Sequence, residues 1–113
     1  MVRLAAQINL ETLKKNIDLV RNHVPEPIKI MGVVKCNAYG HGLPQIATTM
    51  AQAGLDYLVV SEVEEGIRLR KFGIHCPVLT LSDPFYPHLN LALQYNLTLT
   101  VADSDFALRL AAY

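Results

Sequence analysis

The residues best suited to chemistry lie between positions 32 and 42, where a lysine follows an apolar run and precedes two glycines. Lys35 ends that run, at the point where a parallel strand of an α/β barrel would reach the edge that carries its active site. A partly desolvated amine there can attack a carbonyl carbon and form a Schiff base. Gly40 and Gly42 would let the next loop turn sharply and approach a ligand. A second interpretation stays open, because strand-end lysines commonly extend to water without any chemical role.

The elements that would position this lysine alternate between apolar strands and helices. We expect strands over residues 28–34, 57–60, 77–81 and 97–101, with helices beginning near residues 44, 61 and 103 and a short one over 89–93. The first of these strands is apolar enough to be covered on both faces. A short strand over residues 4–10 and a helix capped by Asn9 would precede it. Ser61 and Glu64 have the spacing of a capping box.

This alternation predicts the fold class. Strand and helix recur at intervals of roughly twenty to thirty residues, which indicates right-handed βα units and a parallel sheet. Four such units are half of a (β/α)8 TIM barrel, which typically takes about 250 residues. We therefore predict an α/β fold, a partial barrel of about four βα units preceded by a short strand and a helix. A complete, small doubly wound sheet is the alternative.

Composition narrows the partners and the compartment. The chain has ten basic and ten acidic residues, so its formal net charge of zero indicates neither a nucleic acid nor an anionic membrane as partner. No segment approaches the ~20 apolar residues that cross a bilayer, and no signal peptide is recognised, so we expect a cytoplasmic protein. Cys36 and Cys76 would then be reduced. We expect no metal site, because His23, His75 and His88 share no metal-ligand spacing.

The run VVKCNAYGHG over residues 33–42 resembles the pyridoxal-phosphate attachment signature of alanine racemases, VVKANAYGHG, at nine of ten positions. Cys36 stands where that family usually has alanine, which is close in size. Similarity continues at Glu65, Leu69 and Arg70, which match the family's second helix, and over residues 77–81, which resemble a PILVL strand. The resemblance covers residues 1–113 as the N-terminal part of a barrel domain, without the second half of the barrel and the C-terminal β domain.

The resemblance implies an isomerase that uses pyridoxal 5'-phosphate to interconvert L- and D-alanine, and that supplies D-alanine for cell-wall peptidoglycan. Lys35 would hold the cofactor and exchange the α-proton on one face of the substrate. Tyr39 would donate its hydroxyl to the cofactor phosphate, and Leu81 would pack near the cofactor ring. Structural alternatives remain for both, since Tyr39 could simply cover apolar surface and Leu81 could be an ordinary core leucine. For His41 we expect only a role in fixing the loop.

The complete enzyme implied by the resemblance is a homodimer with its active site at the subunit interface. Its second base is a tyrosine from the C-terminal domain of the other subunit, and no residue of this sequence matches it. We therefore expect this chain alone to be inactive. Two alternatives are a non-catalytic pyridoxal-phosphate-binding barrel protein and a racemase or decarboxylase of another amino acid. The residues that follow the lysine favour alanine racemase over both, and serine or another small amino acid stays open as the substrate.

Overall fold

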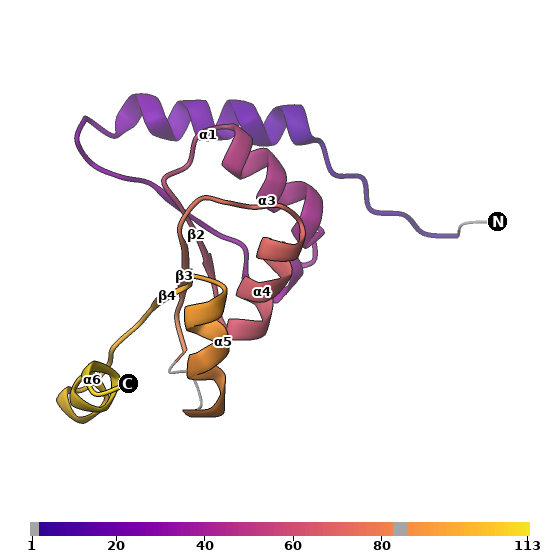
Figure 1. Cartoon of the computed structure of the whole chain (residues 1–113). Helices are drawn as coiled ribbons and strands as arrows, with labels where there is room; N and C mark the ends of the chain where they lie inside the picture. Colours follow the sequence, from indigo (N-terminus) through magenta and orange to yellow (C-terminus); the bar gives the residue numbers. More distant parts are fainter. Residues whose placement is uncertain (1–2, 83–85) are drawn as a thin grey trace.

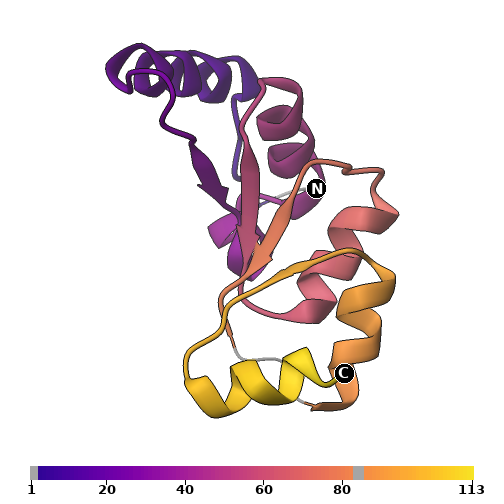
Figure 2. The same cartoon turned by 60° about the vertical axis from the view of Figure 1, so that its left-hand side comes forward.

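The structure is a computed structural model that describes residues 3–82 and 86–113. Its centre is a parallel sheet of four strands in the order β1-β2-β3-β4. The strands are β1 (Met31–Val33), β2 (Tyr57–Val60), β3 (Val78–Thr80) and β4 (Thr98–Leu99). Every strand therefore pairs with its neighbour in the sequence, and all four carboxyl ends lie at one edge, toward which the arrows point in Figure 2.

Helices cover one side of this sheet. The successive strands are connected through α3 (Leu43–Gln52), α4 (Val63–Lys71) and α5 (Leu89–Gln94), with a short 3-10 turn, η1 (Tyr86–His88), before α5. These three helices lie on the same side of the strands (Figure 1). The core forms between the two layers and includes fully buried Leu58, Val60, Leu69 and Val78. A doubly wound sheet would carry helices on both faces, so this arrangement favours the partial barrel.

Two further helices begin where local capping places them. Helix α1 (Leu10–His23) starts after Asn9, whose side-chain oxygen accepts a hydrogen bond from the Thr12 N–H at 3.0 Å, and it packs against α3. Helix α6 (Ser104–Ala111) starts after Asp103, whose carboxylate accepts from the Phe106 N–H at 2.7 Å. The cap at Asn9 confirms the sequence prediction, and Asp103 lies where a helix was expected to begin. Within the described ranges, no helix has the length and apolarity that crossing a membrane requires.

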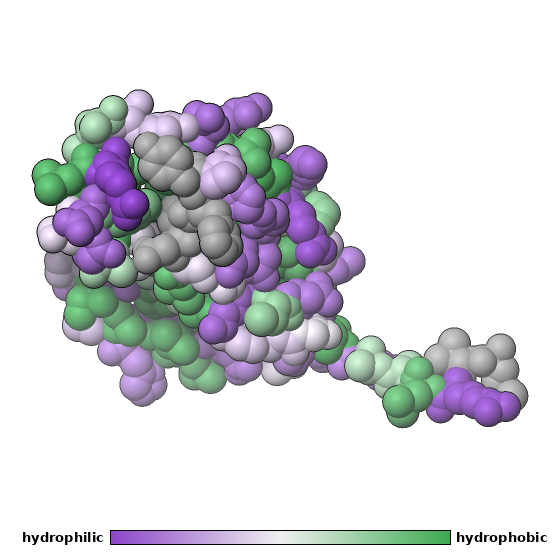
Figure 3. All heavy atoms as spheres, turned by 90° about the horizontal axis from the view of Figure 1, so that it is seen from below, coloured by the Kyte–Doolittle hydropathy of each residue, from purple (hydrophilic) through white to green (hydrophobic). Residues whose placement is uncertain are grey.

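The strand predicted over residues 4–10 does not form, and that prediction is wrong. Residues 3–9 have no regular secondary structure, and Leu10 already belongs to α1. This segment extends away from the body of the molecule (Figures 1 and 3), with Leu4 92% exposed. The alternating pattern gave the segment a strand-like sequence, but a strand needs a neighbour for its main-chain hydrogen bonds. The four-stranded sheet pairs with no part of it.

The second face of the sheet is open at β1, although Val59 of β2 is only 3% exposed on that face. Val33, Val59 and Leu79 lie opposite one another in the register, so their side chains point to the same face. On that face of β1, Met31 is 49% and Val33 39% exposed, whereas Val34 is buried on the helix side. The prediction that this strand is covered on both faces is therefore wrong for this chain. The described residues supply one covering layer, and a closed barrel would supply the other from its remaining strands.

Arg70 ties α4 to the starts of two strands. Its guanidinium donates hydrogen bonds to the main-chain oxygens of Ile74 and Cys76, before β3, at 2.9 and 2.8 Å. It also donates to the oxygens of Tyr95 and Asn96, before β4, at 3.0 and 2.9 Å. A planar guanidinium with five N–H groups can serve four such acceptors, and an ammonium cannot. One side chain thus fixes where both strands enter the sheet.

We expect the substitution Arg70→Lys to lower the free energy of unfolding by about 2 kcal/mol, because several charge-assisted hydrogen bonds are lost while the charge is kept. Urea unfolding followed by circular dichroism measures the change. Arg68→Lys, at an exposed position on the same helix, is the control and should leave the stability nearly unchanged. Equal effects of the two substitutions would contradict the role given to Arg70.

Asp56, just before β2, plays the corresponding part at the starts of the first two strands. Its carboxylate accepts a hydrogen bond from the Ile30 N–H at 2.7 Å and two from Arg21 at 3.3 Å. Arg21 also donates to the Gly54 oxygen at 3.0 Å, so α1 is joined to the loop between α3 and β2. The bond from Ile30 lowers the pKa of Asp56 most, desolvation opposes this, and Arg21 adds to the lowering.

Because its folded pKa lies below the unfolded one, Asp56 stabilises the fold above the unfolded pKa of about 3.9, and this contribution disappears as the pH falls through the folded pKa. We therefore expect Asp56→Asn to flatten the acid limb of the stability curve and to leave its shape near neutral pH unchanged. Chemical unfolding at a series of acidic pH values tests this. Asp18→Asn, on an exposed part of α1, should retain the wild-type acid limb.

Candidate active site

Lys35 lies at the carboxyl edge of the sheet. The strand β1 ends at Val33, and the Val34 N–H still donates to the Val59 oxygen of β2 at 2.8 Å. Lys35 therefore follows the strand by two residues, whereas it would directly follow the strand predicted over residues 28–34. It opens the short helical turn α2 (Lys35–Tyr39), and its side chain is half-buried. The chemistry expected at this edge depends on how that turn holds the amine.

The turn after Lys35 is left-handed. Cys36, Asn37, Ala38 and Tyr39 have φ angles of 54°, 55°, 52° and 54°. Residues other than glycine pay about 1–2 kcal/mol each for this conformation, so four in succession form a strained segment. The sequence predicted only a glycine-containing loop at this place, and its glycines come after the strained residues: Gly40 has a φ of 85°. Such strain is concentrated at functional sites, where the surrounding structure maintains it.

Hydrogen bonds within the loop explain several residues of the motif. The Ala38 N–H donates to the Val34 oxygen at 2.9 Å, which closes the turn. The Asn37 side-chain oxygen accepts from the Leu43 N–H at 2.9 Å, so asparagine joins the turn to the start of α3. His41 Nδ1 lies 2.9 Å from the Ala38 oxygen, which agrees with the expectation that this histidine fixes the loop. Ala38 is only 4% exposed, so a larger side chain would have to displace the atoms packed around it.

Glu65 holds the same turn from the neighbouring βα unit. One carboxylate oxygen accepts from the Cys36 N–H at 2.7 Å, and the other accepts from the N–H groups of Ser61 and Glu62 at 2.7 and 3.1 Å. Glu62 and Glu65 form the capping box of α4. The predicted box at Ser61 and Glu64 is therefore wrong by one residue. Both pairs have the required spacing, and only the Glu65 position also reaches Cys36.

The other two predicted site residues share the carboxyl edge with Lys35. Tyr39 belongs to the left-handed turn and is 59% exposed. Leu81 follows β3, where its N–H donates to the Val60 oxygen at 3.0 Å, and it is 43% exposed. Because β2 lies between β1 and β3, Lys35 and Leu81 stand on either side of it. Their contacts with a cofactor stay a prediction.

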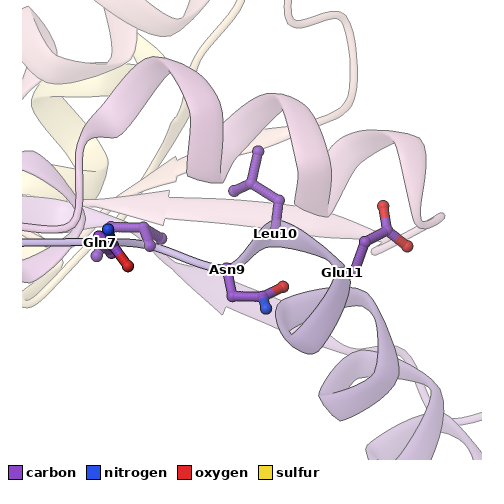
Figure 4. Close-up of a pocket in the computed structure, with 5 residues that line it drawn as sticks. Gln7, Asn9, Leu10 and Glu11 are labelled. Carbon is purple, nitrogen blue, oxygen red and sulfur yellow. The ribbon is translucent and has the colours of Figure 1, made fainter.

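A shallow hollow lies elsewhere, beside the start of α1. It is lined by residues 7–11, which are consecutive in the chain (Figure 4). None of the predicted site residues lines it, and its walls come from a single segment. We therefore place the candidate site at the carboxyl edge of the sheet, where residues from different βα units meet.

The fold and the site define a class: half of a (β/α)8 barrel that presents a lysine at the carboxyl edge of its first strand. Residues 8–113 match the family model described as alanine racemase, N-terminal domain. The chain therefore belongs to the alanine racemase N-terminal domain family, which confirms the family resemblance of the sequence and the partial barrel.

Relatives and solved structures agree with this assignment. The chain is 40% identical over 100 residues to alanine racemase 2 of Bacillus subtilis (strain 168), which covers 88% of this chain and 25% of the relative. It is also 40% identical over 107 residues to alanine racemase of Desulforamulus reducens, covering 95% and 29%. A solved structure of alanine racemase from Clostridium difficile 630 matches with a TM-score of 0.88 at 35% identity, over 93% of this chain and 28% of that one. The same protein is known in complex with cycloserine. The chain thus spans about a quarter of the length of these relatives.

The left-handed turn makes a prediction about Asn37. We expect Asn37→Ala to be less stable than Asn37→Gly by about 1 kcal/mol, because both lose the bond to the Leu43 N–H but only alanine keeps a Cβ that disfavours positive φ. Thermal unfolding of the two variants side by side gives the difference. The order would reverse if residue 37 had ordinary right-handed helical geometry.

Proposed function

We propose that this chain is the cofactor-holding quarter of a pyridoxal-phosphate-dependent racemase that interconverts L- and D-alanine. The observation that carries the proposal is the placement of Lys35 at the carboxyl edge of the sheet, in a turn whose sequence matches the family signature. The family assignment and the 40% identity to an alanine racemase support it. The activity itself belongs to a full-length protein, in which the remaining strands and domains complete the site.

The residues present fit pyridoxal phosphate. The cofactor is an aldehyde with an apolar ring and a phosphate, and it requires a primary amine, an apolar surface and a hydrogen-bond donor. Lys35 is the only lysine in the described part of the chain that follows the carboxyl end of a strand. Tyr39 offers a phenolic hydroxyl in the same turn, and Leu81 offers an exposed apolar side chain at the same edge. Lys35, Tyr39 and Leu81 therefore offer the three kinds of group that this cofactor requires.

The cofactor, when bound, supplies an electron sink that stabilises the charge left on the α-carbon after proton loss. Lys35 would have two tasks: its Nζ would hold the cofactor, and its free amine would take the α-proton from one face of the substrate in one direction of the reaction and give a proton to that face in the reverse direction. Tyr39 would donate its hydroxyl to the cofactor phosphate, and Leu81 would lie beside the cofactor ring. Racemisation also needs a base on the opposite face. We infer that this base comes from outside this chain, from the partner subunit of a homodimer. The chain by itself should therefore be inactive. We expect the complete protein to be cytoplasmic.

We expect Lys35→Ala in a full-length protein containing this chain to lower the rate of alanine racemisation by about three orders of magnitude or more, since both the attachment point and a base are lost. Lys71→Ala, at the exposed end of α4, removes a lysine of the same kind and should retain the wild-type rate. Borohydride reduction followed by mass spectrometry should place the cofactor on Lys35 in the wild type and on no residue in Lys35→Ala.

The same assay distinguishes the alternatives. A protein that binds the cofactor but racemises no amino acid would be a carrier, and one that prefers serine or releases carbon dioxide would act on another substrate or by another reaction. A fast Lys35→Ala variant would refute the proposal directly. The purified 113-residue chain should show no turnover under the same conditions.

A further inference from the structure

A carboxylate from the second βα unit reaches the residue directly after the candidate cofactor lysine. Glu65 Oε1 accepts a hydrogen bond from the main-chain N–H of Cys36 at 2.7 Å, across 29 positions of the sequence. Its other oxygen accepts from the N–H groups of Ser61 and Glu62, directly after β2. A single side chain therefore joins the carboxyl ends of β1 and β2, at the edge where the chemistry is expected. Bonds from N–H groups to a charged carboxylate are among the stronger hydrogen bonds of proteins.

Capping α4 does not require this arrangement. A capping box needs only the bonds around Glu62, and these use one of the two carboxylate oxygens. The bond to Cys36 lies outside the helix and acts on the first N–H of the left-handed turn. That turn has unfavourable backbone angles at four successive residues, so it persists only because its surroundings hold it.

We propose that Glu65 is a positioning residue for Lys35: by fixing the Cys36 N–H, it sets the direction in which the Lys35 side chain leaves the sheet edge. This inference rests on the proposed function and adds a residue to it. An amine that must hold a cofactor and then move a proton at one face of the substrate depends on its placement to within a fraction of an ångström. Because Glu65 also binds the main chain directly after β2, the position of Lys35 after β1 is fixed relative to β2.

Glu65→Asp separates the two tasks of this carboxylate. Aspartate keeps the negative charge in the first turn of α4, but its side chain is one methylene shorter, so it cannot bridge the Cys36 N–H and the N–H groups after β2 at the same time. Glu65→Gln keeps the length but replaces one accepting oxygen by an NH2 group, which cannot accept from an N–H. Glu62→Asp is the matched control, because it makes the same shortening in the same capping box at a residue that has no bond to Cys36.

The experiment uses a full-length protein containing this chain, with added pyridoxal 5'-phosphate. Three quantities are measured for each variant: the dissociation constant of the cofactor from its visible absorbance, the pH dependence of that absorbance, and kcat and KM for alanine. We expect Glu65→Asp and Glu65→Gln to weaken cofactor binding about tenfold, the effect of losing one charge-assisted hydrogen bond. They should also shift the pH profile and lower kcat more than they raise KM. Glu62→Asp should match the wild type in all three.

Thermal unfolding of the same variants separates positioning from stability. Glu65→Asp should unfold close to the wild-type temperature while showing the cofactor effect. The positioning role is refuted if Glu65→Asp binds cofactor like the wild type, if Glu62→Asp has the same effect, or if both Glu65 variants lose the fold. A wild-type protein that neither binds the cofactor nor racemises alanine refutes the proposed function, and the positioning role with it. A wild type that does both, with Glu65→Asp unchanged, refutes the positioning role alone.

Discussion

The left-handed turn after β1 is the constraint on which the rest of the site depends. Its backbone angles are unfavourable for residues with a Cβ, and no local preference of cysteine, alanine or tyrosine supports them. The turn is held instead by contacts from three directions: pairing of Val34 with β2, the Asn37 side chain at the start of α3, and the Glu65 carboxylate from α4. The parallel sheet brings these three elements to one edge, and so the fold as a whole maintains the conformation that presents Lys35.

Features that depend on residues close together in the sequence could be predicted from it. The cap at Asn9 and the start of the last helix near residue 103 were located correctly, because a capping side chain bonds to main chain only three residues away. The order of strands and helices also followed from apolar patterns. Composition and spacing alone did not decide whether Lys35 has a chemical role or simply extends to water. The family resemblance favoured the chemical role.

Features that depend on distant partners could not be predicted in this way. Residues 3–9 have the alternation of a strand but no neighbouring strand to pair with in the described structure. The capping box of α4 had two candidate registers one residue apart, and the contact between Glu65 and Cys36, across 29 positions, belongs to only one of them. The signal for Glu65 was present in the sequence as a capping spacing, but its link to the lysine is visible only once β1 and β2 lie side by side. The left-handed turn could not be predicted either, because only Asn37 among its four residues is of a type that commonly adopts a positive φ.

The open face of the sheet has a consequence for the order of events during synthesis. In a protein of the relatives' length, these strands emerge from the ribosome before the strands that would close a barrel over Met31 and Val33 have been made. Translation adds about 5–20 residues each second, so a chain of this kind keeps apolar side chains in contact with water for many seconds. Side chains that would line the interior of a closed barrel are thus, for that interval, exposed apolar surface of the kind that makes partly folded chains prone to aggregation.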